Sequence, residues 1–221
     1  MDKLIENLNA FERQVAETLE ECGRSGERIE IVAAGKFRSP ETLSELYATG
    51  RISAIGENRV QEFNEKYTPE MVWDIIGRLQ TNKVKYVVGK VRYIQSLDRL
   101  NLADEIERVA AKRGVVQKCL IEINTGEEEA KGGIVAGELD KFLISLENYP
   151  HISVCGVMAV APRGVGEEAL TGCFSKARDA FEKAKRGRAD FKVLSMGMSE
   201  DFRVALKCGA NMLRPGRILF E

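Results

Sequence analysis

The chain has 221 residues, a formal net charge of −1 and 44% hydrophobic residues, which suits one folded domain with a sizeable core over residues 1–221. The near-neutral charge gives no sign of a nucleic-acid-binding surface, and we find neither a signal peptide nor an apolar run of membrane-spanning length. The five cysteines form no C-x-x-C pair, which argues against a disulfide framework or a zinc site and favours a cytoplasmic setting.

The first predicted element is an amphipathic helix at the amino terminus. Apolar residues recur with helical spacing at Leu4, Leu8, Phe11, Val15 and Leu19. This spacing places them on one face, and Gly23 follows where the helix would end.

Eight short apolar runs follow, and each is a predicted strand. They cover residues 29–36, 52–57, 71–77, 91–96, 116–124, 152–162, 192–197 and 211–216. Runs of this length that end at turn residues are typical of buried strands.

Helical segments alternate with these strands. Ser39 and Pro40 supply a cap and a first-turn proline for one helix, and Asp98 opens another that closes at Gly114. A longer helical pattern runs to about Gly187. Alternation of this kind predicts parallel strands with helical crossovers, and eight units favour a closed barrel. We therefore expect a single (β/α)8 TIM barrel with an extra N-terminal helix.

Lys36 is the first candidate functional residue. In a barrel of this kind the site lies at the carboxyl ends of the strands, and Lys36 ends the first strand after five small or apolar residues. Partial desolvation there would lower its pKa and expose an amine that attacks aldehydes. A lysine that reaches into solvent fits the residue equally well.

Two later strand ends carry a predicted phosphate site. Small residues in SMGMS, at 195–199, leave backbone N–H groups free for an anion, and RPGR brings Arg214, Gly216 and Arg217 to the same rim. The plainer alternatives are a turn in which Ser199 caps a helix starting near Glu200, and a surface ion pair for Arg214. Together with Lys36, the phosphate interpretation suggests an aldehyde that bears a phosphate.

The remaining histidine and basic residues of the sequence do not indicate a functional site. His151 is the only histidine, so a histidine triad and a multi-histidine metal site are excluded. Lys83, Lys85, Lys90 and Arg92 are interpreted as a solvated face, because few stacking aromatics accompany them.

Several long motifs in order resemble the pyridoxal phosphate homeostasis proteins. The motifs are IVAAGKFRSPETL, GENRVQE, WDIIGRLQTNKVKY, IQSLDRLNLADEI, LIEINTGEEEAKGG, GVMAVAP, LSMGMSEDF and RPGRILF. The resemblance implies a monomeric or weakly associated barrel similar to the amino-terminal domain of alanine racemases. It also implies that pyridoxal 5′-phosphate (PLP) forms a Schiff base with Lys36.

The resemblance further implies where the cofactor lies. The implied cofactor-binding residues are Ala34, Lys36, Asn58, Met158, Ser195, Gly197, Met198, Arg214, Gly216 and Arg217. Asn58 would lie beside the cofactor, the turn 195–198 would hold the phosphate, and Arg214 would face the pyridine nitrogen. Arg217 departs from the family, which usually has a hydroxyl there, and Pro215 removes one backbone N–H.

An arginine at the pyridine nitrogen favours a carrier over an enzyme. Guanidinium keeps its proton and leaves that nitrogen largely unprotonated, so the ring is a weaker electron sink. Racemases also use a tyrosine base from a second domain, which we do not expect here. We therefore expect a protein that stores PLP and delivers it to apo-enzymes, with no nucleic-acid or membrane partner. The alternatives are a single-domain PLP-dependent racemase and an aldolase-like Schiff-base barrel acting on sugar phosphates.

Overall fold

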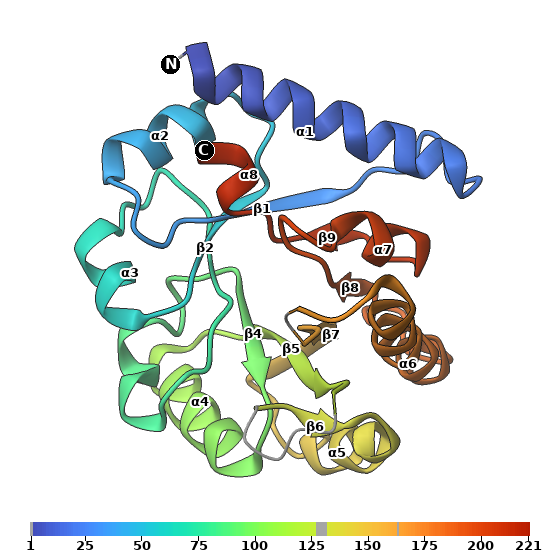
Figure 1. Ribbon diagram of the computed structural model, residues 1–221. Coiled ribbons are helices and arrows are strands. Elements are labelled where there is room, and N and C mark those ends of the chain that lie inside the picture. Colours follow the sequence, from blue (N-terminus) through green and yellow to red (C-terminus); the bar gives the residue numbers. More distant parts are fainter. Residues whose placement is uncertain (1, 127–131, 163) are drawn as a thin grey trace.

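Eight parallel strands close into a barrel in the computed structural model, which describes residues 2–126, 132–162 and 164–221 (Figure 1). Their bounds are β1 Glu30–Ala34, β2 Ala54–Glu57, β3 Trp73–Ile75, β4 Tyr93–Leu97, β5 Gln117–Asn124, β7 Ile152–Ala159, β8 Val193–Ser195 and β9 Met212–Leu213. The ring closes because β1 pairs with both β2 and β9, and β4 pairs with β5. The predicted (β/α)8 TIM barrel is confirmed.

Helices surround the ring of strands (Figure 1). They are α1 Asp2–Glu21, α2 Pro40–Ala48, α3 Val60–Lys66, η1 Thr81–Tyr86, α4 Leu100–Arg113, η2 Ala136–Glu138, α5 Leu139–Leu146, α6 Glu167–Lys185, α7 Phe202–Lys207 and α8 Arg217–Phe220. The crossover between β3 and β4 is the 3-10 helix η1 where the other long crossovers are α-helical. The Ser39 hydroxyl accepts from the backbone N–H of Thr42 and caps α2 as predicted.

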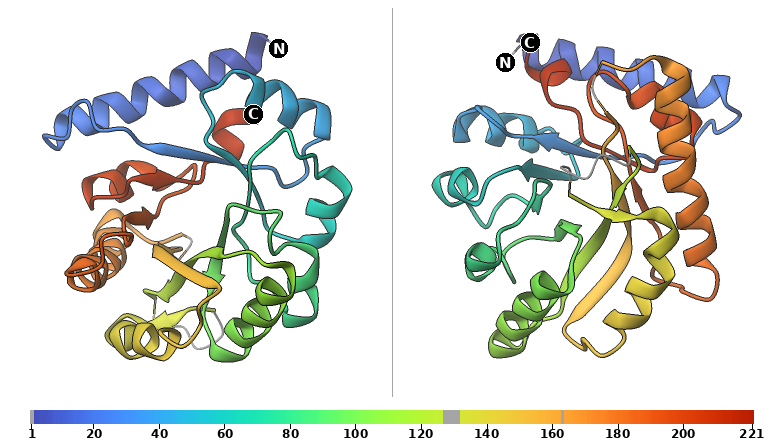
Figure 2. Two further views of the ribbon diagram at one scale, coloured as in Figure 1. Left: turned by 180° about the vertical axis from the view of Figure 1, so that it is seen from behind. Right: turned by 60° about the horizontal axis from the view of Figure 1, so that its bottom comes forward.

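The extra helix α1 lies across the outside of the barrel, close to α7 and α8 (Figure 2). Leu8 and Phe11 on its apolar face are fully buried, and the rings of Phe11 and Phe202 lie 5.0 Å apart, edge to face. Helix α1 also packs against α8, the last helix, so both ends of the described chain lie on the same side of the molecule (Figure 2).

Two local predictions differ from the structure, and one short strand was not predicted. Asp98 does not begin α4, which starts at Leu100 after Arg99; the Asp98 carboxylate instead accepts from the backbone N–H of Gly133. The helix expected near Glu200 begins at Phe202. A short strand that the sequence did not predict, β6 Ile134–Val135, pairs with the last residues of β5. Residues 127–131 of the LIEINTGEEEAKGG motif lie outside the described residues.

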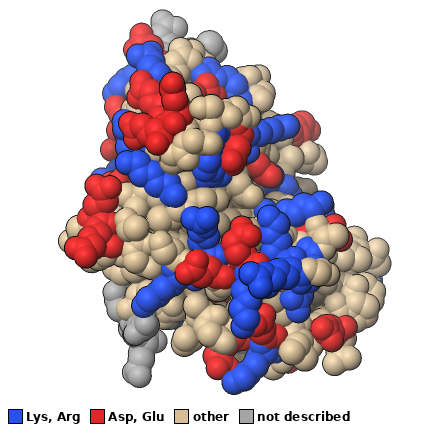
Figure 3. All heavy atoms as spheres, turned by 90° about the vertical axis from the view of Figure 1, so that its right-hand side faces the viewer, with Lys and Arg blue, Asp and Glu red and all other residues tan. Residues whose placement is uncertain are grey.

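Two apolar clusters form the core. The larger fills the space between strands and helices, and the smaller occupies the barrel interior, where Val32, Leu120, Met158 and Met212 meet. No helix in the described part of the chain is long and apolar enough to cross a membrane. On the side of the molecule shown in Figure 3, basic and acidic side chains are interspersed.

Candidate functional site

A cavity of about 780 Å³ lies at the carboxyl ends of the barrel strands. It brings together six of the ten residues expected at the site: Ala34, Lys36, Asn58, Met198, Gly216 and Arg217. The backbone N–H of Ala34 donates to the carbonyl of Pro215 at 2.8 Å, which holds the end of β1 against the RPGR turn. Residues far apart in sequence therefore share one concave surface, which we call the Lys36 cavity.

The other four expected residues do not line this cavity. Met158, Ser195, Gly197 and Arg214 are all buried in the barrel wall or its interior. Arg214 is only 1% exposed, so the surface ion pair considered for it from the sequence is wrong.

Lys36 lies in a tight turn after β1. Phe37, the next residue, has a φ of 64°, an unusual left-handed conformation for a large side chain, and is 78% exposed. The Lys36 ammonium lies 4.4 Å from the Phe37 ring centroid, and the Lys36 side chain is itself exposed. The partial desolvation expected for this lysine from the sequence is therefore not found, although its amine is accessible from the cavity.

Charged groups from β2 and α3 support the turn that carries Lys36. The Lys66 ammonium donates to the carbonyl of Gly35 at 3.0 Å and to the buried carboxylate of Glu57 at 2.9 Å. The carboxylate of Glu62 accepts from the Phe37 backbone N–H at 3.3 Å. Burial raises the pKa of Glu57, while the hydrogen bond from Lys66 acts to lower it.

Gly35 is required by this arrangement. A Cβ atom there would lie 2.6 Å from Glu57 Oε1 and 3.1 Å from both Ile55 and Leu43. The structure shows that the buried Glu57 carboxylate occupies the space that a side chain would need.

At the predicted phosphate site, backbone N–H groups donate hydrogen bonds to side chains of the protein itself. The Ser199 hydroxyl oxygen accepts from the backbone N–H groups of Gly216 at 3.0 Å and Ile218 at 3.3 Å. The Asp201 carboxylate accepts from the Met198 N–H at 2.5 Å. Ser199 therefore does not cap α7; its oxygen occupies an acceptor position between two strand ends.

These donors suit an anionic group. A phosphate oxygen can replace the Ser199 or Asp201 oxygen as acceptor for the same N–H groups. Arg217, which forms an exposed ion pair with Glu200, adds a guanidinium at the cavity mouth. Gly197, with a φ of 90°, allows the turn to pass against α7, where a Cβ would lie 2.7 Å from that of Ala205.

A hydrogen-bonded chain crosses the barrel interior from Arg214. Its guanidinium donates to the Ser195 hydroxyl at 2.5 Å and to the Ala159 carbonyl at 2.8 Å. Ser195 donates to Gln95 Oε1 at 2.8 Å, and Gln95 Nε2 donates to the Asp74 carboxylate at 2.9 Å. Burial lowers the pKa of Arg214 to about 10.

The hydrogen-bonded series that starts at Arg214 ends at a buried ion pair near the other end of the barrel. Arg92 binds Asp74 through two nitrogens at 3.0 and 2.7 Å, and binds Glu30 at 2.6 Å. Arg92 therefore does not belong to the solvated face that the sequence predicted for it together with Lys83, Lys85 and Lys90. Sequence reasoning missed the link through Gln95 and Asp74, because only the barrel geometry shows which strand residues face inward.

Glu122 on β5 is a titratable group in the mouth of the barrel. Burial raises its pKa to about 7, and the nearby Asp98 carboxylate adds to the rise. The guanidinium groups of Arg214, Arg78 and Arg99 oppose it. One of its carboxyl oxygens is buried without a hydrogen-bond partner in the described chain, which favours the neutral form.

Glu122 should make stability depend on pH. A carboxyl group with a raised folded-state pKa stabilises the fold below its ordinary pKa of 4.5, and this stabilisation is lost as the pH rises through about 7. We expect the unfolding free energy to fall by about 2 kcal/mol between pH 5 and pH 8 because of this group. Denaturant titrations of Glu122→Gln should show a flatter pH profile and higher stability at pH 8. An unchanged profile would contradict the assignment.

The remaining candidates add no chemistry. His151 lies in a turn, and its Nδ1 lies 2.7 Å from Glu107. All five cysteines are free, and the described residues contain no group of three or more potential metal ligands of the His, Cys, Asp and Glu types.

Comparisons with known proteins agree with the sequence resemblance. The family model described as "Alanine racemase, N-terminal domain" matches residues 8–221. A pyridoxal phosphate homeostasis protein from Aquifex aeolicus is 40% identical over 223 residues, covering 97% of this chain and 96% of the relative. Among solved structures, PipY of Synechococcus elongatus with PLP bound has a TM-score of 0.83 at 27% identity, covering 99% of this chain and 100% of PipY. A protein from Bifidobacterium adolescentis has a TM-score of 0.92 at 25% identity, covering 99% of this chain and 95% of that protein.

Proposed function

Because the chain belongs to the pyridoxal phosphate homeostasis protein family, we propose that it binds PLP in the Lys36 cavity and releases it to other proteins. In this proposal Lys36 holds the cofactor reversibly as a Schiff base, and apo PLP-dependent enzymes receive it. The protein would act in the cytoplasm, as a monomer.

One observation supports this proposal most: an accessible primary amine and the donors for a phosphate line the same cavity. Bound PLP supplies an aldehyde that condenses with a primary amine and an electrophilic ring. Lys36 provides the amine, and the two turns that contain Met198 and Gly216 provide backbone N–H donors, with Arg217 beside them. Asn58 lines the same cavity and offers an amide to the cofactor.

The backbone N–H groups of the proposed phosphate site already have acceptors within the protein, and this supports reversible binding of the cofactor. An N–H group left without an acceptor costs free energy, so a phosphate site with no internal acceptor would oppose release of its ligand. Here Ser199 and Asp201 accept from those N–H groups when no phosphate does. Release of the cofactor then leaves few orphaned donors, which suits a carrier.

We propose that Arg214, held in place by Ser195, reaches the bound cofactor from the barrel interior below the Lys36 cavity. Their mutual hydrogen bond fixes the guanidinium direction, and the Ala159 carbonyl holds its other terminal nitrogen. A guanidinium held in this way would present a donor to the pyridine nitrogen without giving up its proton.

The racemase alternative rests on the alanine racemase domain that the chain matches. Racemisation needs acid–base groups on both faces of the substrate carbon. In the described part of the chain, neither tyrosine nor histidine lines the Lys36 cavity. Three carboxylates among the described residues line the cavity, but each already has a partner: Asp201 accepts from the Met198 N–H, and Glu200 and Glu221 form ion pairs with arginines. This lining favours the carrier over the racemase.

Cofactor transfer tests the proposal. Protein loaded with PLP is mixed with an apo PLP-dependent enzyme, and recovery of that enzyme's activity is followed beside an assay for racemisation of alanine and serine. We expect recovery of the recipient without amino-acid turnover by the protein itself. Racemisation at an enzyme-like rate would favour the alternative, and failure to take up PLP would contradict both.

A further inference from the structure

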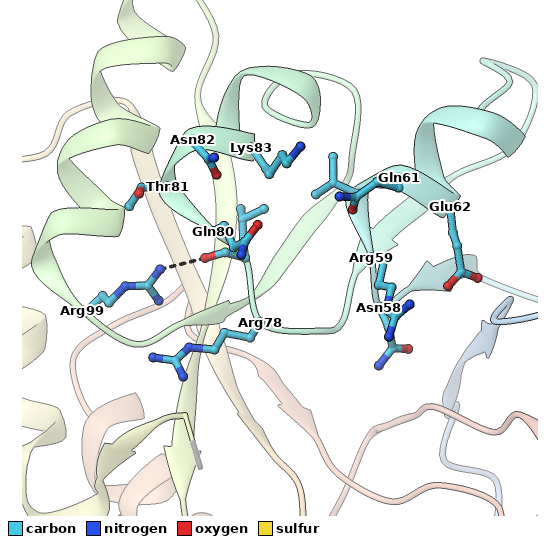
Figure 4. Close-up of a pocket in the computed structure, with 12 residues that line it drawn as sticks. Asn58, Arg59, Gln61, Glu62, Arg78, Gln80, Thr81, Asn82, Lys83 and Arg99 are labelled. Atoms are coloured by element: carbon cyan, nitrogen blue, oxygen red, sulfur yellow. Dashed lines mark hydrogen bonds between the residues drawn. The ribbon is translucent and has the colours of Figure 1, made fainter. Parts of the chain in front are cut away.

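A second cavity lies beside the Lys36 cavity. It has a volume of about 950 Å³ and shares Asn58 with its neighbour. Its walls come from the segments that follow β2 and β3, and Arg99, just after β4, closes one side (Figure 4). We call this cavity the basic pocket, for the cationic residues Arg59, Arg78, Lys83 and Arg99 in its lining.

The charge of the basic pocket is one-sided. Among the described residues, four cationic side chains line it against one acidic side chain, Glu62, which already accepts from Lys66 and from the Phe37 backbone. Asp98, just outside the lining, offsets the charge of Arg99 alone. In Figure 4, Arg78 and Arg99 extend to one side of the pocket and Glu62 lies at the other. The proximity of several guanidinium groups is unfavourable without an anion, so the pocket has an electrostatic reason to bind one.

Two arginines of the basic pocket make no direct side-chain contact with an acceptor in the described part of the chain, although the Arg78 guanidinium acts at longer range on Glu122. Among the described residues, neither Arg59 nor Arg78 makes an ion pair or a hydrogen bond through its side chain. Arg99 differs, because it pairs with Asp98 and donates to the Leu79 carbonyl at 2.7 Å. Arg99 is thus held in place, while Arg59 and Arg78 keep their donors free for a ligand.

The wall between the two cavities is tightly packed. A Cβ atom on Gly77 would lie 2.4 Å from the carbonyl oxygen of Asn58, so the segments after β2 and β3 meet backbone to backbone. The Ser96 hydroxyl donates to the Gly77 carbonyl at 2.7 Å and fixes this segment from β4. The backbone that carries Arg78 is therefore held in position before any ligand binds.

The lining indicates the chemical class of the ligand. Guanidinium groups match phosphate oxygens with paired donors, and several cations favour a dianion. Gln61, Gln80, Thr81 and Asn82 surround the rest of the pocket with amide and hydroxyl groups. The volume lies within the range of small-molecule sites, roughly 300–1,000 Å³. We propose that the basic pocket binds a small phosphate monoester with a polar, hydroxyl-bearing body, at a site separate from Lys36.

The 3-10 helix η1 offers a matched pair of variants. Lys83 and Lys85 both lie on it, but only Lys83 lines the pocket. Calorimetric titration of the full chain with glycerol 3-phosphate should detect binding to the wild type. Arg78→Gln and Lys83→Gln should each weaken it about tenfold, since each removes a charge-assisted donor. Lys85→Gln, equal in charge change, should leave the affinity within about twofold.

Arg217→Gln distinguishes the two cavities. If the phosphate ester binds in the basic pocket, this variant keeps the wild-type affinity. Binding that is lost in Arg217→Gln and kept in Arg78→Gln would assign the anion to the Lys36 cavity and overturn the proposal. Equal weakening by Lys85→Gln, or no binding by the wild type, would also overturn it. PLP uptake by the same variants, measured separately, reports on the proposed function independently.

Discussion

Lys36→Ala should abolish covalent attachment of PLP. The wild type, mixed with PLP, should develop the visible absorption of a Schiff base and keep the cofactor after borohydride reduction and denaturation. The variant should keep none, because the cavity offers no other lysine in its described lining. Weak binding through the phosphate donors should remain, and it should fall as salt screens the contribution of Arg217.

Lys36→Arg is the matched control for charge. It preserves a cation at the same position but lacks an amine that forms a Schiff base. We expect it to behave like Lys36→Ala in the reduction experiment. Full retention of reduced cofactor by either variant would show that another lysine carries the attachment.

Asp74→Ala should cause the largest loss of stability among single polar substitutions in the barrel interior. Asp74 is fully buried and accepts from Arg92, Gln95 and the Tyr93 backbone N–H. Its removal leaves these donors without their acceptor inside the barrel. Breaking a buried ion pair in this way costs about 3–5 kcal/mol. We expect a loss of about 3 kcal/mol in denaturant unfolding, the lower end of this range, since Arg92 keeps Glu30 as a partner.

A surface pair provides the comparison for this variant. Glu138 pairs with Lys141 on the outside of the barrel, and both side chains are more than half exposed. Glu138→Ala should change the unfolding free energy by less than about 1 kcal/mol. If Asp74→Ala cost no more than Glu138→Ala, the buried contacts of Asp74 would contribute no more to stability than a surface ion pair, which would contradict this prediction.

The barrel could be predicted because its signal repeats along the chain. Each of the eight strand predictions rested on an apolar run between turn residues, and small errors at the ends did not change the alternation. Asp98 shows the limit of local signals: its carboxylate satisfies the N–H of Gly133, a residue distant in sequence, and so does not begin α4. The strand β6 has only two residues, too few for a periodic pattern.

The candidate site was predicted in part. Lys36 and the RPGR turn could be identified because strand ends of a barrel converge, and the structure places them around one cavity. The exposure of Lys36 could not be predicted, because it depends on the path of the turn after β1. The burial of Arg214 could not be predicted either, because it depends on which residues face the barrel interior. The link from Glu57 through Lys66 to Gly35 joins three segments, and the GENRVQE motif does not reveal it alone.

Arg217 illustrates how the structure changes a sequence interpretation. From the family resemblance, Arg217 was expected to replace a hydroxyl that usually stands at this position. Here Ser199, from the neighbouring strand end, places a hydroxyl against the backbone N–H groups of Gly216 and Ile218. A hydroxyl is therefore present beside the turn, and Arg217 lies at the rim with Glu200.

The most direct test of the central claim is peptide mapping of the wild-type protein after loading with PLP and reduction with borohydride. Mass spectrometry of the digested protein would locate the reduced cofactor on a single side chain. The proposal predicts the label on the peptide that contains Lys36 and on no other lysine. A label on a different lysine, or no label after saturation with PLP, would contradict it.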